Sequence, residues 1–290
     1  QIDYVIANGS ECEPYITCDD QLMRTQSKGI VEGMRLVLRL FPNARGVIAI
    51  EDNKPEAIEA MTHACEGDAN LSVLPVMAKY PEGGERSLIG VVTGRQLRFG
   101  QLPADLGCVV CNVSTLNAIY RAVCKTEPLM GRLFTVSGDA VANPHTLFVR
   151  IGTSCSELLE AAGGIKPGSE ARKILCGGPM MGIAMSTLDA PIAKNNNALT
   201  VLASDEVELA EQQMTACLRC GRCGHVCPIG LVPQMMAEAA ERQDYERYEK
   251  KLYGLDCIAC GSCTYICPAK RPLMQLFKQT KAAIMAAKRK

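Results

Sequence analysis

Two cysteine runs toward the end of the chain constrain its fold more than any other feature. Each run follows the pattern Cys-x-x-Cys-x-x-Cys-x-x-x-Cys-Pro, once over residues 217–228 and again over 257–268. The two-residue gaps let three thiolates converge from one tight loop on three corners of an iron-sulfur cubane. A glycine after the second cysteine of each run allows the backbone to approach closely. The repeat therefore predicts two 4Fe-4S clusters.

The fourth cysteine of each run leads away from its own loop, and in runs of this type it ligates the other cluster. We therefore expect each cluster to combine three cysteines of one run with the last cysteine of the other. The predicted ligands are Cys217, Cys220, Cys223 and Cys267 for the first cluster, and Cys257, Cys260, Cys263 and Cys227 for the second.

Zinc is the alternative occupant, because zinc also accepts four thiolates. Zinc sites, however, are built from two Cys-x-x-Cys pairs rather than from triplets followed by Cys-Pro. The other eight of the 16 cysteines lack ligand spacing, and we expect most of them to be small buried apolar residues. His225 lies inside the first run, where four cysteines already suffice, and is expected behind the ligands or at the surface.

Charge and hydropathy exclude several classes of function. The 290 residues include 31 basic and 31 acidic side chains, so no overall field favours nucleic acid as a partner. No run of 18 apolar residues occurs, so membrane contact is expected only through partner proteins. The cysteine pattern without a signal peptide indicates a reducing compartment. The sequence opens with Gln1 and runs directly into a strand pattern, and we expect it to be part of a longer protein.

The first 130 residues alternate short apolar runs with helical patterns, which is typical of an α/β layer structure. One helix pattern covers residues 22–41 and is stopped by Pro42. The predicted strands are residues 4–7, 46–50, 71–77 and 108–113. We interpret this part as a doubly wound nucleotide-binding domain.

The later residues predict two further domains. Strand patterns over 133–138 and 146–150 and a short helix over 156–162, closed by a glycine pair, favour a small α+β domain. From Ser204 onward the pattern is helical around the cysteine runs. The expected domains are residues 1–130, 131–203 and 204–290.

Three segments follow predicted strands of the first domain, namely residues 8–15, 79–86 and 110–115. Ligands of open α/β sheets bind at the carboxyl ends of the strands. Glycines before a helix, as in the second segment, suit a phosphate or a flat ring pressed against the backbone. Each segment alone is also compatible with an ordinary solvated loop.

Together, these segments and the cysteine runs resemble the C subunits of Rnf electron-transport complexes, which are ion-translocating ferredoxin:NAD oxidoreductases. More distantly they resemble the FMN- and NADH-binding subunit of respiratory complex I. The resemblance rests most on residues 8–20 and on 257–273. Residues 135–141 and 177–182 resemble the SLBB β-grasp module of the same family. The resemblance as a whole implies a complex I flavoprotein-like α/β domain, an SLBB β-grasp domain and a ferredoxin-type helical domain with two 4Fe-4S clusters.

The resemblance also implies a flavin site. The residues implied to contact FMN are Asn8, Ser10, Glu11 and Cys12, with Tyr80, Gly83 and Glu85 beside the flavin or nicotinamide and Asn112 and Thr115 completing the pocket. Hydride chemistry belongs to the cofactors, so no catalytic acid or nucleophile is expected, and Glu85 and Glu11 are candidates for orienting the nicotinamide. The family's glycine-rich loop, which holds the flavin phosphate, would precede Gln1.

The function implied is that of a peripheral subunit that passes electrons between NAD(H), FMN and the two clusters. Its implied partners are the other Rnf subunits, including membrane-embedded and iron-sulfur subunits, at the cytoplasmic face of the bacterial inner membrane. Two alternatives stay open. One is a corrinoid reductase of the same module family, and the other is a non-catalytic iron-sulfur relay whose α/β domain is only a docking scaffold.

Overall fold

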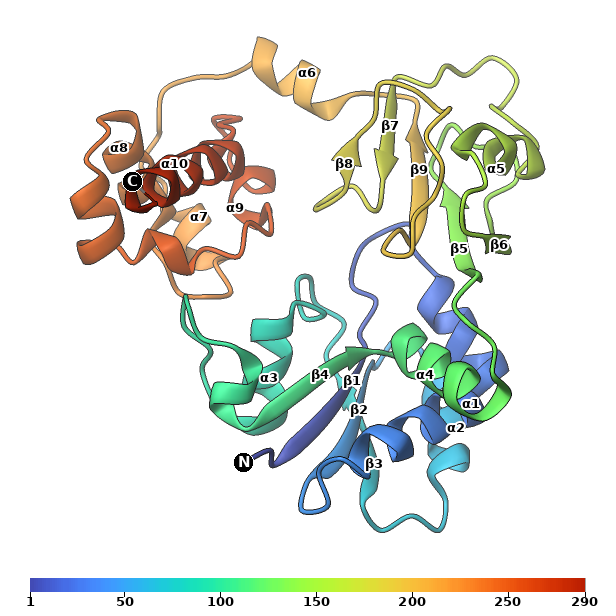
Figure 1. Ribbon diagram of the computed structural model, residues 1–290. Helices are drawn as coiled ribbons and strands as arrows, with labels where there is room; N and C mark the ends of the chain where they lie inside the picture. The colour runs from blue at the N-terminus through green and yellow to red at the C-terminus, as the bar shows by residue number, and fades with distance from the viewer. Residues whose placement is uncertain (290) are drawn as a thin grey trace. The chain divides into compact units, whose positions relative to one another are not determined.

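The computed structural model describes residues 1–289, and the chain forms two compact units over residues 1–204 and 205–290 (Figure 1). The first unit contains two sheets, one of four strands and one of five. The second unit is helical. Within residues 1–289, none of the helices has the length and apolar character that a membrane span requires.

The four-stranded sheet is parallel throughout, in the order β3-β2-β1-β4. Because β2 and β4 flank β1 on opposite sides, the strand order reverses between β1 and β4, which is where such sheets bind ligands. The strands are β1 (Tyr4–Gly9), β2 (Arg45–Glu51), β3 (Leu71–Val76) and β4 (Cys108–Asn112). The predicted strands are confirmed, except that Val113 begins a helix and Met77 lies just beyond the end of β3.

Helices cover both faces of this sheet. The larger core joins Val5 and Ile48 of the sheet to Met34, Met61 and Leu116 of three helices on one face, and α3 covers the other face (Figure 1). The helices are α1 (Cys18–Leu38), α2 (Pro55–Cys65), α3 (Glu85–Thr93) and α4 (Val113–Lys125), with a 3-10 turn η1 (Pro103–Leu106) before β4.

Helices α1 and α4 approach so closely that a side chain has no room at Gly33. A Cβ atom there would lie 1.9 Å from the carbonyl oxygen of Leu116. This contact fixes the start of α4, and therefore the end of β4, against α1.

The five-stranded sheet has the order β6-β5-β9-β7-β8, and of its strand pairs β5–β9 is parallel and the others are antiparallel. Phe134, Val136, Leu158 and Val201 lie in its core beneath helix α5. The elements are β5 (Gly131–Ser137), β6 (His145–Arg150), α5 (Cys155–Ala161), β7 (Lys173–Cys176), β8 (Ile183–Ala184) and β9 (Ala198–Leu202).

The helical unit packs around α8 and α10. Met236, Tyr248, Phe277 and Ile284 are buried between its helices, and the rings of Tyr248 and Phe277 lie 6.3 Å apart. The elements are α6 (Glu206–Gln212), α7 (Arg222–His225), α8 (Pro233–Glu241), the π-helix η2 (Arg247–Lys251), η3 (Gly254–Asp256), α9 (Ser262–Tyr265) and α10 (Leu273–Lys288).

Candidate functional site: two cysteine cavities and a cluster of residues at the strand ends

The two cysteine runs adopt the same backbone conformation. Arg219 and Ala259 both have φ near +53°, and Gly221 and Gly261 both take left-handed conformations immediately before α7 and α9. In each loop a backbone N–H donates to the first cysteine, from Arg219 to Cys217 Sγ and from Ala259 to Cys257 Sγ, at 3.4 Å in both cases. Donors of this kind stabilise thiolate ligands.

Each of two cavities brings together four cysteines, with about 400 Å³ of empty space that includes open solvent. Three cysteines come from one loop and the fourth from the end of the other loop, which is the arrangement that cross-ligation requires. One cavity is lined by Cys217, Cys220, Cys223 and Cys267, and the other by Cys257, Cys260, Cys263 and Cys227. The ligand assignment itself stays a prediction.

The spacing of the sulfur atoms fits a cluster better than a single ion. Tetrahedral zinc would hold its four sulfurs about 3.8 Å apart, given a Zn–S distance of about 2.3 Å. Within residues 1–289, the potential ligand atoms that all lie within 4.8 Å of one another belong to Glu11, Cys18 and Asp19, and neither cysteine quartet is drawn together in this way. His225 is exposed and does not line either cavity.

The predicted flavin residues Asn8 and Asn112 lie side by side at the point where the strand order reverses. They are register partners at the carboxyl ends of β1 and β4. Asn8 donates from Nδ2 to the Gly83 carbonyl oxygen at 2.9 Å, and Asn112 caps α4 by accepting from the Ser114 N–H at 2.8 Å. Three segments that are distant in sequence therefore meet at one sheet edge.

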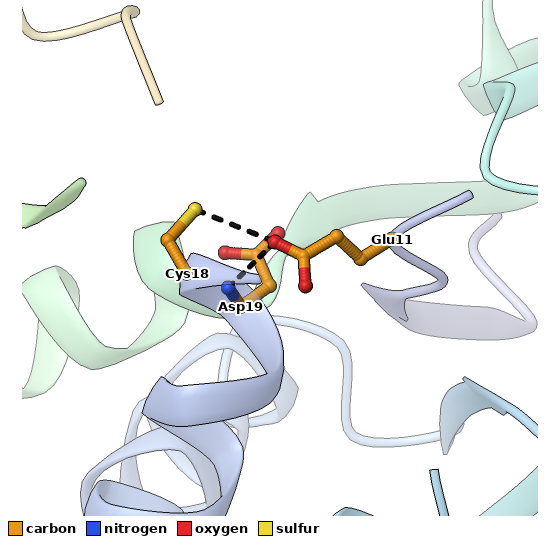
Figure 2. A group of neighbouring side chains, drawn as sticks. All are labelled: Glu11, Cys18 and Asp19. Atoms are coloured by element: carbon orange, nitrogen blue, oxygen red, sulfur yellow. Dashed lines mark hydrogen bonds between the residues drawn. The ribbon is translucent and has the colours of Figure 1, made fainter. Parts of the chain in front are cut away.

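The Glu11 carboxylate lies at the N-terminal end of α1 and points toward its first turn (Figure 2). Its carboxylate accepts hydrogen bonds from the backbone N–H groups of Asp19 and Asp20, at 2.8 and 3.2 Å, and from the Cys18 thiol at 3.4 Å. Lys54 Nζ lies 3.2 Å from the other side of the carboxylate. A carboxylate at a helix N-terminus is stabilised by the helix dipole, so Glu11 fixes where α1 begins.

Asp19 is buried beside Glu11 and accepts a hydrogen bond from Asn112 Nδ2 at 2.7 Å. Burial raises the pKa of Asp19 above its usual range, and the charge of Glu11 adds to this, whereas the Asn112 hydrogen bond lowers it. The folded protein therefore favours the protonated form of Asp19 more than the unfolded chain does.

This pKa shift predicts a pH dependence of stability. Since the folded pKa lies above the unfolded value of about 4, the free energy of unfolding falls as the pH rises from about 4 toward neutrality. Asp19→Asn keeps an acceptor for Asn112 but cannot ionise, so its unfolding free energy is expected to fall less over the same range. Burial also raises the pKa values of Glu13, Glu51 and Glu82. Part of the dependence of the unfolding free energy on pH therefore remains in the Asp19→Asn variant. Urea denaturation between about pH 4.5 and 7 measures this, and equal slopes would contradict it.

Two buried polar atoms near this edge have no hydrogen-bond partner in the part of the chain that the structure describes. Ser10 is 8% exposed, and its Oγ lacks a partner, as does Glu82 Oε1. Between them, the Gly83 N–H donates to Cys12 Sγ at 3.3 Å. Buried polar groups are normally paired, so these atoms are suited to meet a ligand or another part of a longer chain.

Thr115 lies on the side of this edge that faces the β-grasp domain. It lines a cavity of about 610 Å³, open solvent included, together with Asp19, Ser114, Arg132 and Lys194. The Arg132 guanidinium lies 3.5 Å from Ser114 Oγ and donates to the Lys194 carbonyl oxygen at 2.6 Å. Hydroxyls at the start of α4 and two cationic side chains suit a phosphate.

The remaining predicted residues lie on the loop that opens α3. Glu85 is the first residue of that helix and is exposed, whereas Tyr80 is half-buried in the preceding turn. The structure therefore brings one set of predicted residues into one neighbourhood, namely Asn8, Ser10, Cys12, Gly83 and Asn112. Glu11 is engaged as a helix cap, and Glu85 lies at the surface.

Glu13 joins the strand-end segment to the β-grasp domain. Its carboxylate accepts the N–H groups of Met180 and Met181, at 3.1 and 2.7 Å, in the turn between β7 and β8. Two residues after Glu13, the Tyr15 carbonyl oxygen accepts a hydrogen bond from Ser137 Oγ at 2.6 Å. The β-grasp domain thus holds the segment that leads from β1 into α1.

Glu13→Ala is expected to destabilise the first unit by about 2 kcal/mol, because two N–H groups lose a charged acceptor. The exposed Glu160→Ala in α5 is the matched control and is expected to change stability by less than about 0.5 kcal/mol. Urea denaturation of the two variants checks this difference. Equal stabilities would show that the Glu13 contact contributes nothing.

Sequence reasoning missed Lys54 and Arg132 as parts of this region, and it placed Glu13 and Asp19 in the region without their contacts. Lys54 follows the carboxyl end of β2, so the strand-end rule contained the signal that could have found it. Arg132 and Glu13 act across two domains, and no local pattern indicates their partners.

Known proteins match every part of this arrangement. Residues 1–121 match the family described as the Nuo51 FMN-binding domain, residues 133–184 the SLBB domain and residues 216–272 the 4Fe-4S dicluster domain. The C subunit of the proton-translocating ferredoxin:NAD(+) oxidoreductase complex of Clostridium ljungdahlii is 43% identical over 99% of this chain. Its Na(+)-translocating counterpart in Acetobacterium woodii is 41% identical over 100%. The chain is therefore similar over its full length to proteins named as C subunits of these complexes.

The predicted fold class and cofactor classes are confirmed by these matches, since the chain combines an FMN-binding, an SLBB and a dicluster domain in this order. The chain spans 62% of the length of the Clostridium relative and 64% of the Acetobacterium relative. It spans 44% of the C subunit of an ion-translocating oxidoreductase complex from Haemophilus influenzae. An NAD+-reducing [NiFe]-hydrogenase chain shares the fold, with a TM-score of 0.63 at 20% identity over 99% of this chain and 59% of its own length.

Proposed function

We propose that this chain transfers electrons between NAD(H) and two 4Fe-4S clusters through FMN, as the peripheral electron-input or electron-output subunit of an ion-translocating ferredoxin:NAD oxidoreductase. The observation that carries the proposal is the occurrence in one chain of two four-cysteine cavities and of an FMN-binding domain whose strand-end segments meet at one sheet edge. A flavin converts two-electron hydride chemistry into single-electron steps, which is what clusters can accept.

The residues gathered at the carboxyl ends of β1 and β4 fit FMN. We propose that the flavin is held by Asn8, Ser10, Cys12, Gly83 and Asn112. The partnerless, buried Ser10 Oγ and the close backbone approach at Gly83 support this assignment. Thr115 and Ser114, with Arg132 across the cavity, offer further donors to the phosphate group, beside the glycine-rich loop that the resemblance implies.

The carboxylates have different proposed roles. Glu11 fixes the start of α1 and thereby the strand-end segment that leads into it. The Lys54 ammonium group balances the charge of the Glu11 carboxylate. The exposed Glu85 at the start of α3 is free to orient a nicotinamide, and Tyr80 would lie beside the ring. No residue of the chain is required to act as a nucleophile or general acid.

The proposed partners are NADH and the other Rnf subunits, including membrane-embedded and iron-sulfur subunits. The names of the relatives, which are complex subunits, support this. We propose that the chain works at the cytoplasmic face of the cell membrane, held there by its partners. We propose a division into domains at residues 130 and 203, which the order of the three matched families over residues 1–121, 133–184 and 216–272 supports.

An anaerobic titration with NADH tests this function. The native full-length protein, reconstituted with iron, sulfide and FMN, is expected to lose flavin absorbance and to develop the EPR signal of reduced 4Fe-4S clusters. Reduction by dithionite but not by NADH, in protein that has retained its flavin, would instead indicate an iron-sulfur relay without catalytic function. Reduction of a bound corrinoid would indicate a corrinoid reductase.

A further inference from the structure

The two cysteine loops share a backbone but differ in the side chains they carry. Three positions between the first three ligands of each loop differ. They are Leu218, Arg219 and Arg222 in the first loop and Ile258, Ala259 and Ser262 in the second. Since φ at positions 219 and 259 is the same, this difference does not arise from the loop conformation. One loop carries two positive charges and the other carries none.

The two loops also differ in exposure. Cys217 and Cys220 are exposed, and Leu218 between them is 64% exposed. Cys260, the counterpart of Cys220, is only 8% exposed, and Ile258 is half-buried. The first loop therefore lies at the surface of the helical unit, and the second loop lies deeper.

The two arginines of the first loop differ from others in the helical unit. Among the described residues, no carboxylate forms an ion pair with Arg219 or Arg222, whereas Arg242 and Arg271 pair with Glu238 and Glu241. The helical unit carries 13 basic and 10 acidic residues in a chain of zero net charge, so its field adds to that of the two arginines. An exposed apolar residue flanked by unpaired charges is typical of a docking surface, and complementary charge speeds association.

We propose that the loop from Cys217 to Cys223 is the docking surface for an acidic electron-carrier protein. The carrier's carboxylates would face Arg219 and Arg222, and Leu218 would pack against its apolar centre. One electron leaves the reduced first cluster and reduces a one-electron acceptor in the carrier, and no bond is made or broken. This inference rests on the proposed electron-transfer function, to which it adds the exit and the chemistry of the partner.

The test uses the full-length protein with its clusters reduced by dithionite, which is then removed, so it does not depend on NADH. Stopped-flow absorbance follows electron transfer to a flavodoxin chosen for its negative net charge. The double variant Arg219→Glu, Arg222→Glu is expected to reduce the second-order rate constant at least about tenfold at low salt, and the difference should shrink above about 0.5 M salt. The control is Lys251→Glu, Lys278→Glu, which makes the same charge change outside both loops and should reduce the rate constant less than about threefold.

Basic cytochrome c is the second acceptor, because a changed cluster potential would alter its rate constant as well. The proposal predicts that the arginine variant reacts with cytochrome c at least as fast as the wild type does. If the arginine variant and the lysine control variant were slowed equally with flavodoxin, only net charge would matter, and the proposal would be overturned. Equal slowing of the arginine variant with both acceptors would also overturn it. Clusters that dithionite cannot reduce would contradict the proposed electron-transfer function itself. In that case the affinity of the protein and its arginine variant for oxidised flavodoxin would still test the docking surface.

Discussion

Replacing Cys267 with alanine is expected to remove the first 4Fe-4S cluster and to leave the second in place, although Cys267 lies in the second cysteine run. The reason is that Cys267 lines the cavity formed by Cys217, Cys220 and Cys223. Cys227→Ala is expected to have the reciprocal effect, because Cys227 lines the cavity of Cys257, Cys260 and Cys263. Each variant should bind about four iron atoms instead of about eight.

Iron and sulfide analysis, with EPR of the dithionite-reduced protein, measures this. Cys124→Ala is the matched control, because Cys124 is an exposed cysteine on α4 and lines neither cavity. Since the two losses differ in which cluster survives, the two variants should give different EPR signals. If Cys267→Ala removed the cluster of its own loop, the ligands would not be crossed between the loops.

Gly83→Ala is expected to weaken FMN binding by the full-length protein at least about tenfold, which corresponds to about 1.4 kcal/mol. A Cβ atom at Gly83 would lie 2.2 Å from the Ser10 carbonyl oxygen and 3.1 Å from Cys12 Sγ. The α3 loop and the segment after β1 would have to separate, which would break the Gly83 contacts with Asn8 and Cys12.

Gly90→Ala provides the control for this substitution. Gly90 lies within α3, and the nearest atom to its added Cβ is the Arg95 carbonyl oxygen at 3.8 Å. This variant should bind FMN as the wild type does and should be slightly more stable, since alanine is favoured over glycine in a helix. Quenching of FMN fluorescence gives both dissociation constants. Equal affinities of the two variants would mean that the Gly83 turn does not shape the flavin site.

Much of the fold follows from local sequence. The short apolar runs over 4–7 and 46–50 indicate strands because each strand is covered on both faces. The first helix precedes Pro42 as expected, although it ends at Leu38 rather than at residue 41. The cysteine runs are equally local, since their spacing fits one tight loop and their repeat indicates two sites.

The parts that local sequence did not predict depend on contacts between distant segments. The resemblance implied that Glu11 contacts FMN, and it gave no sign that the Glu11 oxygens accept the N–H groups that begin α1 and pair with Lys54 of another strand end. Glu13 binds the backbone N–H groups of Met180 and Met181, which are far away in the sequence. A hydrogen bond of this kind leaves no periodic trace in the sequence, because the partner is a backbone group that almost any residue supplies.

The order of reduction after rapid mixing with NADH tests the central claim, that electrons pass through the flavin to the two clusters. In anaerobic stopped-flow of the full-length protein with FMN and both clusters bound, flavin absorbance is predicted to fall first. The cluster absorbance should then fall in a later phase whose rate does not depend on NADH concentration. Clusters that stay oxidised while the bound flavin is fully reduced would contradict the account.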